Sequence, residues 1–130
     1  MILYHFCANR HIRNILHKGI CIGGVTEILP TGYVVHSGWI WLTLNGNPKE
    51  QTWDGGLLIR YSRTAWRLTV SIPDNKLERL YDRQRITGLY PGANTLFAGF
   101  RGAEDWRVFK GAIPATWIIQ ADDMRKNGGC

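Results

Sequence analysis

The chain has 130 residues, a formal net charge of +6 at pH 7 and a sequence pI of about 9.6. This length fits one domain, and a hydrophobic content of 45% with six Trp residues is enough to build a core. The positive charge permits an anionic partner such as nucleic acid, but the basic residues are scattered along the chain. A solvated basic surface explains the charge equally well.

Several classes of protein are excluded by what the sequence lacks. No apolar run reaches the eighteen or so residues that a membrane-spanning helix needs, so no membrane association is expected. The N-terminus does not have the pattern of a secretory signal. The cysteines are Cys7, Cys21 and Cys130. Their odd number and irregular spacing indicate reduced thiols in a cytoplasmic protein without a metal site.

The first element predicted is a strand over residues 2–7 that carries a polar pair, Tyr4 and His5, inside an apolar run. Buried polar groups need partners, so His5 is a candidate site residue. A helix is predicted from residue 8 to 18, because apolar side chains recur there at helical spacing. We expect Asn9 to cap its first turn and Gly19 to end it.

The middle of the chain predicts loops around one aromatic strand. Glycines and a proline favour an irregular loop over residues 21–31, and residues 32–38 are interpreted as a loop or weak strand. A strand is predicted over 39–44, with Trp39, Trp41 and Thr43 on one face.

The clearest alternation lies in residues 63–72, where apolar and polar side chains alternate as in a half-buried strand. Asp74 is expected to cap a short helix that extends through Tyr81. The remaining predictions are a possible strand at 57–61, an irregular basic segment at 82–94, a possible strand at 95–100, a turn at 101–105, and strands at 106–110 and 116–119.

One or two short helices followed by many short strands predict an α+β domain built mainly of antiparallel sheet. We expect residues 1–120 to form a single domain. Residues 121–130 are expected to be a flexible C-terminal tail, because they are polar and end in Gly-Gly-Cys.

The order of local patterns resembles small ADP-ribosyltransferase-fold proteins. The patterns are Tyr-His-Phe at residues 4–6, Lys-Gly-Ile at 18–20, Gly-Trp-Ile-Trp-Leu-Thr at 38–43, a strand ending in Ser-Ile-Pro at 63–73, and a segment opening with Glu-Asp-Trp at 104–118. The relatives that they resemble are the RNA 2′-phosphotransferases and the DNA-targeting ADP-ribosyltransferase toxins. The resemblance covers most of residues 2–119 and rests on order rather than on one motif.

The resemblance implies a fold of two small, mainly antiparallel sheets around a cleft that holds NAD as co-substrate. It implies that His5 contacts the NAD ribose and that an aromatic side chain, from Tyr33, Trp39 or Trp41, stacks on nicotinamide. Thr43 completes the expected cofactor-binding set of His5, Tyr33, Trp41 and Thr43. Glu104 would orient the ribose and stabilise positive charge, so Glu104 and His5 are the expected catalytic residues.

This chemistry has a physical basis. Breaking the bond to nicotinamide develops positive charge on the ribose, which a carboxylate stabilises if it is aimed at that charge. An aromatic side chain gives the leaving group a flat apolar wall, and a neutral histidine can bond ribose hydroxyls. Asp105 directly follows Glu104, so either acid could be the catalytic one. The serine-threonine-serine strand of the family is absent.

Two functions follow from the resemblance. The first is an NAD-dependent ADP-ribosyltransferase that modifies a protein or nucleic-acid target. The alternative is a catalytically inactive binding protein on the same fold, for example a phage-type inhibitor of a host defence protein. A third possibility, from the charge and the Trp residues, is a nucleic-acid-binding module. The simpler interpretations also stand: His5 as a core histidine and Glu104 as part of a solvated turn.

Overall fold

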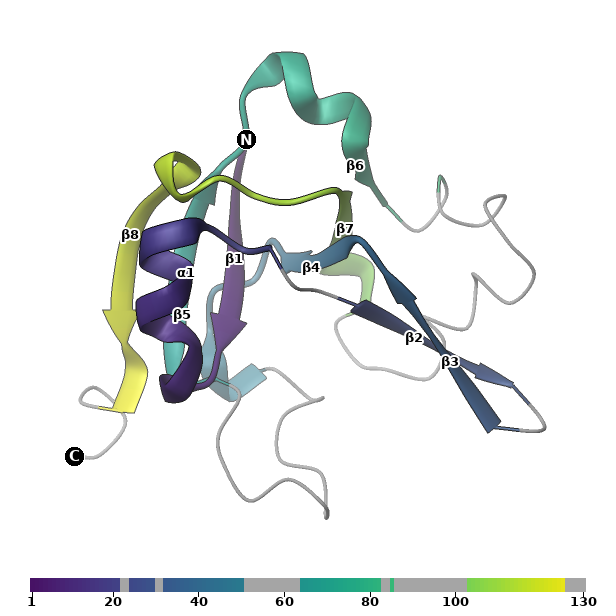
Figure 1. Cartoon of the computed structure of the whole chain (residues 1–130), viewed down its shortest axis with the longest axis horizontal. Coiled ribbons are helices and arrows are strands. Elements are labelled where there is room, and N and C mark those ends of the chain that lie inside the picture. The colour runs from purple at the N-terminus through teal and green to yellow at the C-terminus, as the bar shows by residue number, and fades with distance from the viewer. Residues whose placement is uncertain (22–23, 30–31, 51–63, 83–84, 86–102, 126–130) are drawn as a thin grey trace.

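The computed structural model describes residues 1–21, 24–29, 32–50, 64–82, 85 and 103–125, with the backbone alone for 24–29 and 32–37. The described strands form one six-stranded antiparallel sheet, in the order β6-β7-β4-β1-β5-β8, and a separate hairpin of β2 and β3 (Figure 1). The strands are β1 (Ile2–Cys7), β2 (Gly24–Leu29), β3 (Gly32–Ser37), β4 (Trp39–Thr43), β5 (Trp66–Ser71), β6 (Leu80–Tyr81), β7 (Trp106–Lys110) and β8 (Ile118–Asp123).

The α+β class and the mainly antiparallel pairing are thus confirmed. An arrangement of two sheets around a cleft is not shown, because the described strands give one sheet and a hairpin. Within the described residues, no helix has the length and apolar character needed to cross a membrane.

Helix α1 (Ile12–Lys18) lies across one face of β1, β5 and β8 (Figure 1). Side chains two apart on each strand point to this face, which explains the buried alternation Leu68, Val70 and Ile72 predicted from the sequence. The core beneath the helix joins Leu3, Cys7, Ile12, Ile20, Ile40, Leu42, Leu68, Val70, Ile72, Leu80, Phe109 and Ile113. Fully burying one such aliphatic side chain is worth about 1.5–3 kcal/mol.

The start of the helical segment corrects the prediction for Asn9. Residues Asn9–His11 form a 3-10 helix that leads into α1, and neither helix has a side-chain cap. The Asn9 side-chain oxygen instead accepts a hydrogen bond from the indole N–H of Trp66, at 2.9 Å. The indole is a donor that needs an acceptor, so Asn9 links the beginning of the helical segment to the beginning of β5.

The end of α1 agrees with the prediction for Gly19. Its φ is +86° and its ψ is −175°, so the chain leaves the helix in a conformation that glycine alone adopts readily. The Gly19 N–H donates to the carbonyl of Ile15 at 2.8 Å. The next residue, Ile20, exchanges two backbone hydrogen bonds with Ile113, at 2.8 and 3.0 Å.

The loop predicted for residues 21–31 is wrong over most of its length. Residues 24–29 form β2 and pair in antiparallel register with β3, so that Thr26 lies opposite Val35. The weak strand considered for 32–38 is present as β3. The glycines at 23 and 24 suggested a loop, but the β-branched residues that follow favour a strand once a partner strand is available. The hairpin extends away from the six-stranded sheet (Figure 1).

The helix predicted from Asp74 through Tyr81 is shorter and tighter than expected. Asp74–Arg79 is a 3-10 helix without a side-chain cap, and Leu80–Tyr81 is strand β6. Leu80 lies opposite Phe109 and is buried. Pairing with β7 therefore takes these two residues out of the helix.

The C-terminal strand also differs from the prediction. Ala115–Trp117 is a 3-10 helix, and β8 begins at Ile118 and extends to Asp123, so residues 121–123 contribute to the sheet. Met124 continues this contact, because its N–H donates to the Ala65 carbonyl at 2.8 Å. The strands predicted at 57–61 and 95–100, and all but residues 82 and 85 of the segment 82–94, lie outside the described residues.

The environments of Cys7 and Cys21 predict a sharp difference in thiol reactivity. Cys7 is buried, and burial raises the pKa of its thiol to about 11, from an ordinary value of 9.0. Cys21 is exposed. The shift reduces the thiolate fraction of Cys7 about a hundredfold at neutral pH, before any loss of access. We expect iodoacetamide at pH 7.5 to modify Cys21 and to spare Cys7 until urea unfolds the protein, as peptide mass spectrometry would detect. Equal labelling of both in the folded protein would contradict the buried position of Cys7.

Candidate functional site

The six-stranded sheet is weakly joined at its centre. β1 pairs with β5 over six register positions and β4 pairs with β7 over five, but β1 and β4 are paired at a single position, Tyr4 opposite Thr43. The sheet therefore consists of two halves, β6-β7-β4 and β1-β5-β8, that meet along β1 and β4. We call the contact between β1 and β4 the central junction.

The His5 side chain makes a hydrogen bond across the central junction. Its Nδ1 lies 2.8 Å from the backbone carbonyl oxygen of Trp41, across the junction. A carbonyl can only accept, so Nδ1 carries the proton and donates. This bond supplies the Trp41 carbonyl with a donor where the ladder between the two strands has ended. The simpler interpretation of His5, a core histidine bonded to a backbone carbonyl, thus fits this geometry.

The surroundings of His5 favour its neutral form. Desolvation by burial lowers the pKa of His5 from its ordinary value of 6.5, and the bond to the Trp41 carbonyl opposes this shift to a smaller extent. With Nδ1 protonated and the ring neutral, Nε2 is an acceptor. His5 can therefore receive a hydrogen bond from a hydroxyl group, but at neutral pH it does not add positive charge to the junction.

The other cofactor residues predicted on β4 lie on the opposite face of the sheet. Tyr4 faces Thr43 across the junction, so alternation puts His5 on the helix-covered face and Thr43 with Trp41 on the other. Thr43 is 1% exposed, and its hydroxyl oxygen accepts from the Asn45 N–H at 3.1 Å. Trp41 packs edge-on against Trp106, with ring centroids 5.5 Å apart.

Tyr33 does not lie in the six-stranded sheet that carries these residues, but in the separate hairpin of β2 and β3. It lies in β3, where its backbone pairs with Ile28, and its side chain is outside the described part of the structure. Trp39, the third aromatic candidate, packs against Tyr81 at the far end of β4, with centroids 5.1 Å apart. His5 on β1 therefore lies on a strand next to that of Trp41 and Thr43, but its side chain is on the opposite face of the sheet.

Glu104 lies in the turn that leads into β7. Ala103–Asp105 is a 3-10 helix, and the Glu104 side chain is exposed. Two hydrogen bonds to backbone carbonyls fix the turn: the Glu104 carbonyl accepts from the Arg107 guanidinium, and the Asp105 carbonyl accepts from the Leu44 N–H at 2.9 Å. Because Trp106 faces Thr43, this acidic turn lies beside the same end of β4 that meets β1.

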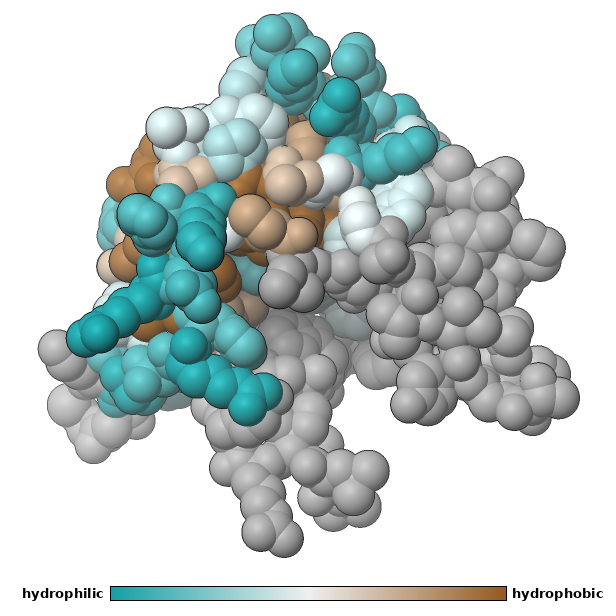
Figure 2. All heavy atoms as spheres, viewed as in Figure 1, coloured by the Kyte–Doolittle hydropathy of each residue, from teal (hydrophilic) through white to brown (hydrophobic). Residues whose placement is uncertain are grey.

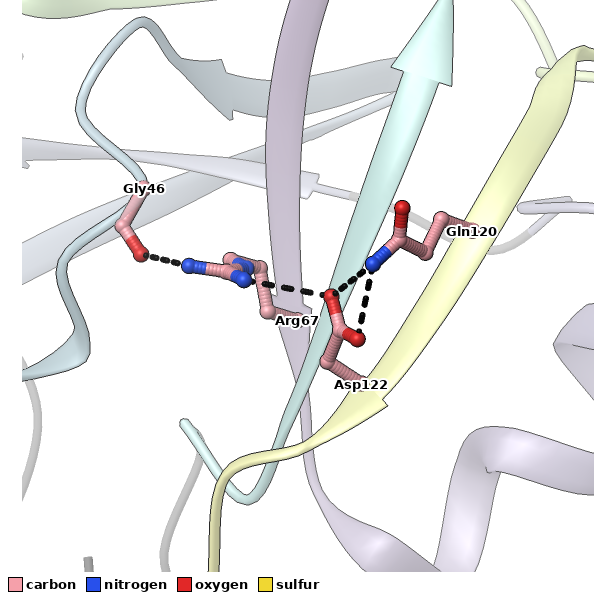
Figure 3. Close-up of polar contacts among 4 residues, drawn as sticks. All are labelled: Gly46, Arg67, Gln120 and Asp122. Carbon is pink, nitrogen blue, oxygen red and sulfur yellow. Dashed lines mark hydrogen bonds and ion pairs between the residues drawn. The ribbon is translucent and has the colours of Figure 1, made fainter. Parts of the chain in front are cut away.

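A polar cluster around Arg67 was missed by the sequence reasoning. Arg67 on β5 donates to the Gly46 carbonyl at 2.9 Å and to Asp122 on β8 at 3.1 Å (Figure 3). Gln120 donates to both carboxylate oxygens of Asp122. The Gln120 bonds first, and then Arg67, lower the pKa of Asp122 from its ordinary value.

The Arg67 cluster fixes the chain that leaves β4. The Arg67 guanidinium carbon lies 5.6 Å from the centre of the Tyr4 ring, and Gly46 approaches the same ring so closely that a Cβ there would lie 3.0 Å from it. Arg67 Nε is buried and has no hydrogen-bond partner. The alternating pattern of β5 puts Arg67 on this face, but its pairing with Asp122 joins residues 55 apart in sequence, which no local pattern reveals.

Comparisons with known proteins leave the site to be interpreted from its geometry. Among the residues that the structure describes, no group of three or more His, Cys, Asp and Glu side chains could hold a metal ion. No model of a protein family, no curated protein and no solved structure matches the chain.

Proposed function

We propose that the protein is an NAD-dependent ADP-ribosyltransferase that modifies a protein or nucleic-acid target. The observation that carries the proposal is the strand order β7-β4-β1, in which the turn of Glu104 leads into one neighbour of β4 and His5 lies on the other. The reduced thiols Cys7 and Cys21 fit a reducing compartment such as the cytoplasm.

The two halves of the proposed site have suitable properties. NAD supplies an ADP-ribosyl group whose bond to nicotinamide breaks with positive charge developing on the ribose. The exposed Glu104 carboxylate can approach that charge, and His5 can accept a bond from a ribose hydroxyl through Nε2 while Nδ1 stays on the Trp41 carbonyl. Thr43 does not fit a contact with NAD, because its side chain is buried and its hydroxyl oxygen accepts a hydrogen bond from the Asn45 N–H.

A second candidate, a non-catalytic binding protein, is favoured by the distribution of the predicted residues over the sheet. His5 already has a structural partner in the Trp41 carbonyl, and the side chains of Trp41 and Thr43 lie on the other face. A binding protein that does not use NAD has no need to bring these side chains to one face of the sheet. The two candidates differ in whether NAD binds and is consumed.

The test measures nicotinamide release from NAD by the purified protein, together with the shift in melting temperature that NAD causes. For the enzyme, we expect NAD to raise the melting temperature and Glu104→Gln to slow nicotinamide release by about a hundredfold or more without unfolding the protein. Glu78→Gln is the control, because Glu78 is an exposed acid in another 3-10 helix. If millimolar NAD leaves the melting temperature unchanged, the protein is not an NAD-dependent enzyme, and the non-catalytic binding protein is the function that stands. Release unaffected by Glu104→Gln but abolished by Asp105→Asn would move the catalytic role to Asp105.

A further inference from the structure

The outward side of α1 and of the 3-10 helix Asn9–His11 before it carries a concentrated set of basic groups. Arg10, His11, Arg13, His17 and Lys18 are all exposed, and we call these five residues the basic helix face. Hydrophilic side chains gather over α1 in Figure 2. The first acidic residue of the chain is Glu27, so the basic residues of this face have no acidic neighbour close in sequence.

The helix geometry keeps these groups pointing away from the sheet. Ile12 is buried and Ile15 packs against the core, which fixes the inward side of α1. Arg13 and His17 are four residues apart and form one row on the outward side, and Asn14 and Lys18 form the adjacent row. Arg10 donates to His11 Nε2 at 3.2 Å, at the N-terminal end of the same surface.

We propose that the basic helix face binds the phosphate backbone of double-stranded nucleic acid without reading its sequence. Arg13 and Lys18 are separated by about 7.5 Å along the helix axis at a rise of about 1.5 Å per residue. B-form DNA presents one phosphate per about 1.7 Å of its axis, so each of these two cations can neutralise one phosphate of the same duplex. The proposal does not depend on NAD chemistry and goes beyond the proposed function.

The composition of the face decides which anionic partner it fits. Proteins that hold single strands stack bases mainly on large aromatic side chains, and residues 8–19 contain no Phe, Tyr or Trp. Protein partners are usually anchored by large buried side chains at the centre of the interface. The one large apolar side chain exposed on α1 is Leu16, which lies toward the core side of the helix. Binding to the phosphate backbone of a duplex needs only cationic side chains, which this face has.

The experiment measures binding of a fluorescein-labelled 20-base-pair duplex of arbitrary sequence by anisotropy between 25 and 200 mM KCl. The variant Arg13→Gln/Lys18→Gln removes two charges from the basic helix face. The variant Lys49→Gln/Lys76→Gln removes two charges from 3-10 helices elsewhere and serves as the matched control. Circular dichroism and melting temperatures verify that each variant is folded.

We expect the wild type and the control to bind with similar affinity. The variant of the helix face should bind at least tenfold more weakly at 50 mM KCl. Its plot of log K against log salt should be shallower by about 1.8, because two phosphates would no longer be neutralised. An equal loss of affinity in both variants would overturn the proposal in favour of diffuse attraction by net charge. Tighter binding of a single strand of the same length would overturn it too. Helix-dependent binding of poly-glutamate as tight as that of the duplex would assign the face to an acidic protein instead.

Discussion

Replacing Gly19 with alanine is expected to reduce the free energy of unfolding by about 3 kcal/mol or more, the largest effect that we expect from a single methyl group in this protein. Gly19 ends α1 with φ of +86° and an extended ψ, a combination that side chains rarely tolerate. The strain of that conformation is only part of the cost.

The larger part is a collision with backbone. A Cβ on Gly19 would lie 2.2 Å from the Ile113 carbonyl oxygen and 2.8 Å from the Ala115 nitrogen. Backbone atoms cannot rotate away as a flexible side chain can. Moving the segment would break the two hydrogen bonds between Ile20 and Ile113, whose side chains are fully buried. The close approach therefore joins the end of α1 to the segment before β8.

Gly38→Ala is the matched control, because Gly38 has φ of +84° but a Cβ added there would meet no atom within 4 Å. It should cost about 1–2 kcal/mol, for the backbone conformation alone. Urea denaturation followed by Trp fluorescence measures both. Equal losses of stability for the two variants would show that conformational strain, not contact with residues 113–115, decides the role of Gly19.

The parts of the fold that could be predicted are those with a strong local pattern. Residues 66–71 alternate so regularly that β5 follows from the sequence, and the aromatic strand predicted at 39–44, between Gly38 and Asn45, is present as β4. β2 and β8 could not be predicted in the same way. β2 is stabilised by its pairing with β3, and the polar end of β8 by Arg67 and Asp122, which are contacts between distant residues.

The same distinction applies to the candidate site. A histidine within an apolar strand indicated that His5 needs a partner, and it has one. That the partner is the Trp41 carbonyl could not be predicted, because it depends on the ladder between β1 and β4 ending after one register position. The resemblance grouped His5, Trp41 and Thr43 by order along the chain, whereas alternation along paired strands separates them by face.

His5 is expected to make the stability of the protein depend on pH below about 6.5, the ordinary pKa of a histidine. The native state lowers the pKa of His5, so it binds fewer protons there than the unfolded chain, whose histidine titrates near 6.5. Stability is therefore highest above that pH and falls as the pH drops through it, by up to about 1.4 kcal/mol per pH unit. Carboxylates such as Asp122, with a pKa below its ordinary 3.8, lose their contribution only at lower pH.

Replacing His5 should reduce the pH dependence of stability and should also lower the stability itself. His5→Leu removes the hydrogen bond that His5 donates to the Trp41 carbonyl, which should reduce the free energy of unfolding by about 1–3 kcal/mol at pH 7.5, where His5 is neutral. The measurement is urea denaturation at pH 5.0, 6.0, 7.0 and 7.5 for the wild type, His5→Leu and His17→Gln, an exposed histidine of α1. The wild type and His17→Gln should lose stability toward pH 5, and His5→Leu should lose much less. If His5→Leu keeps the full slope, another group causes it, and His5 does not hold the two halves of the sheet together as a neutral donor.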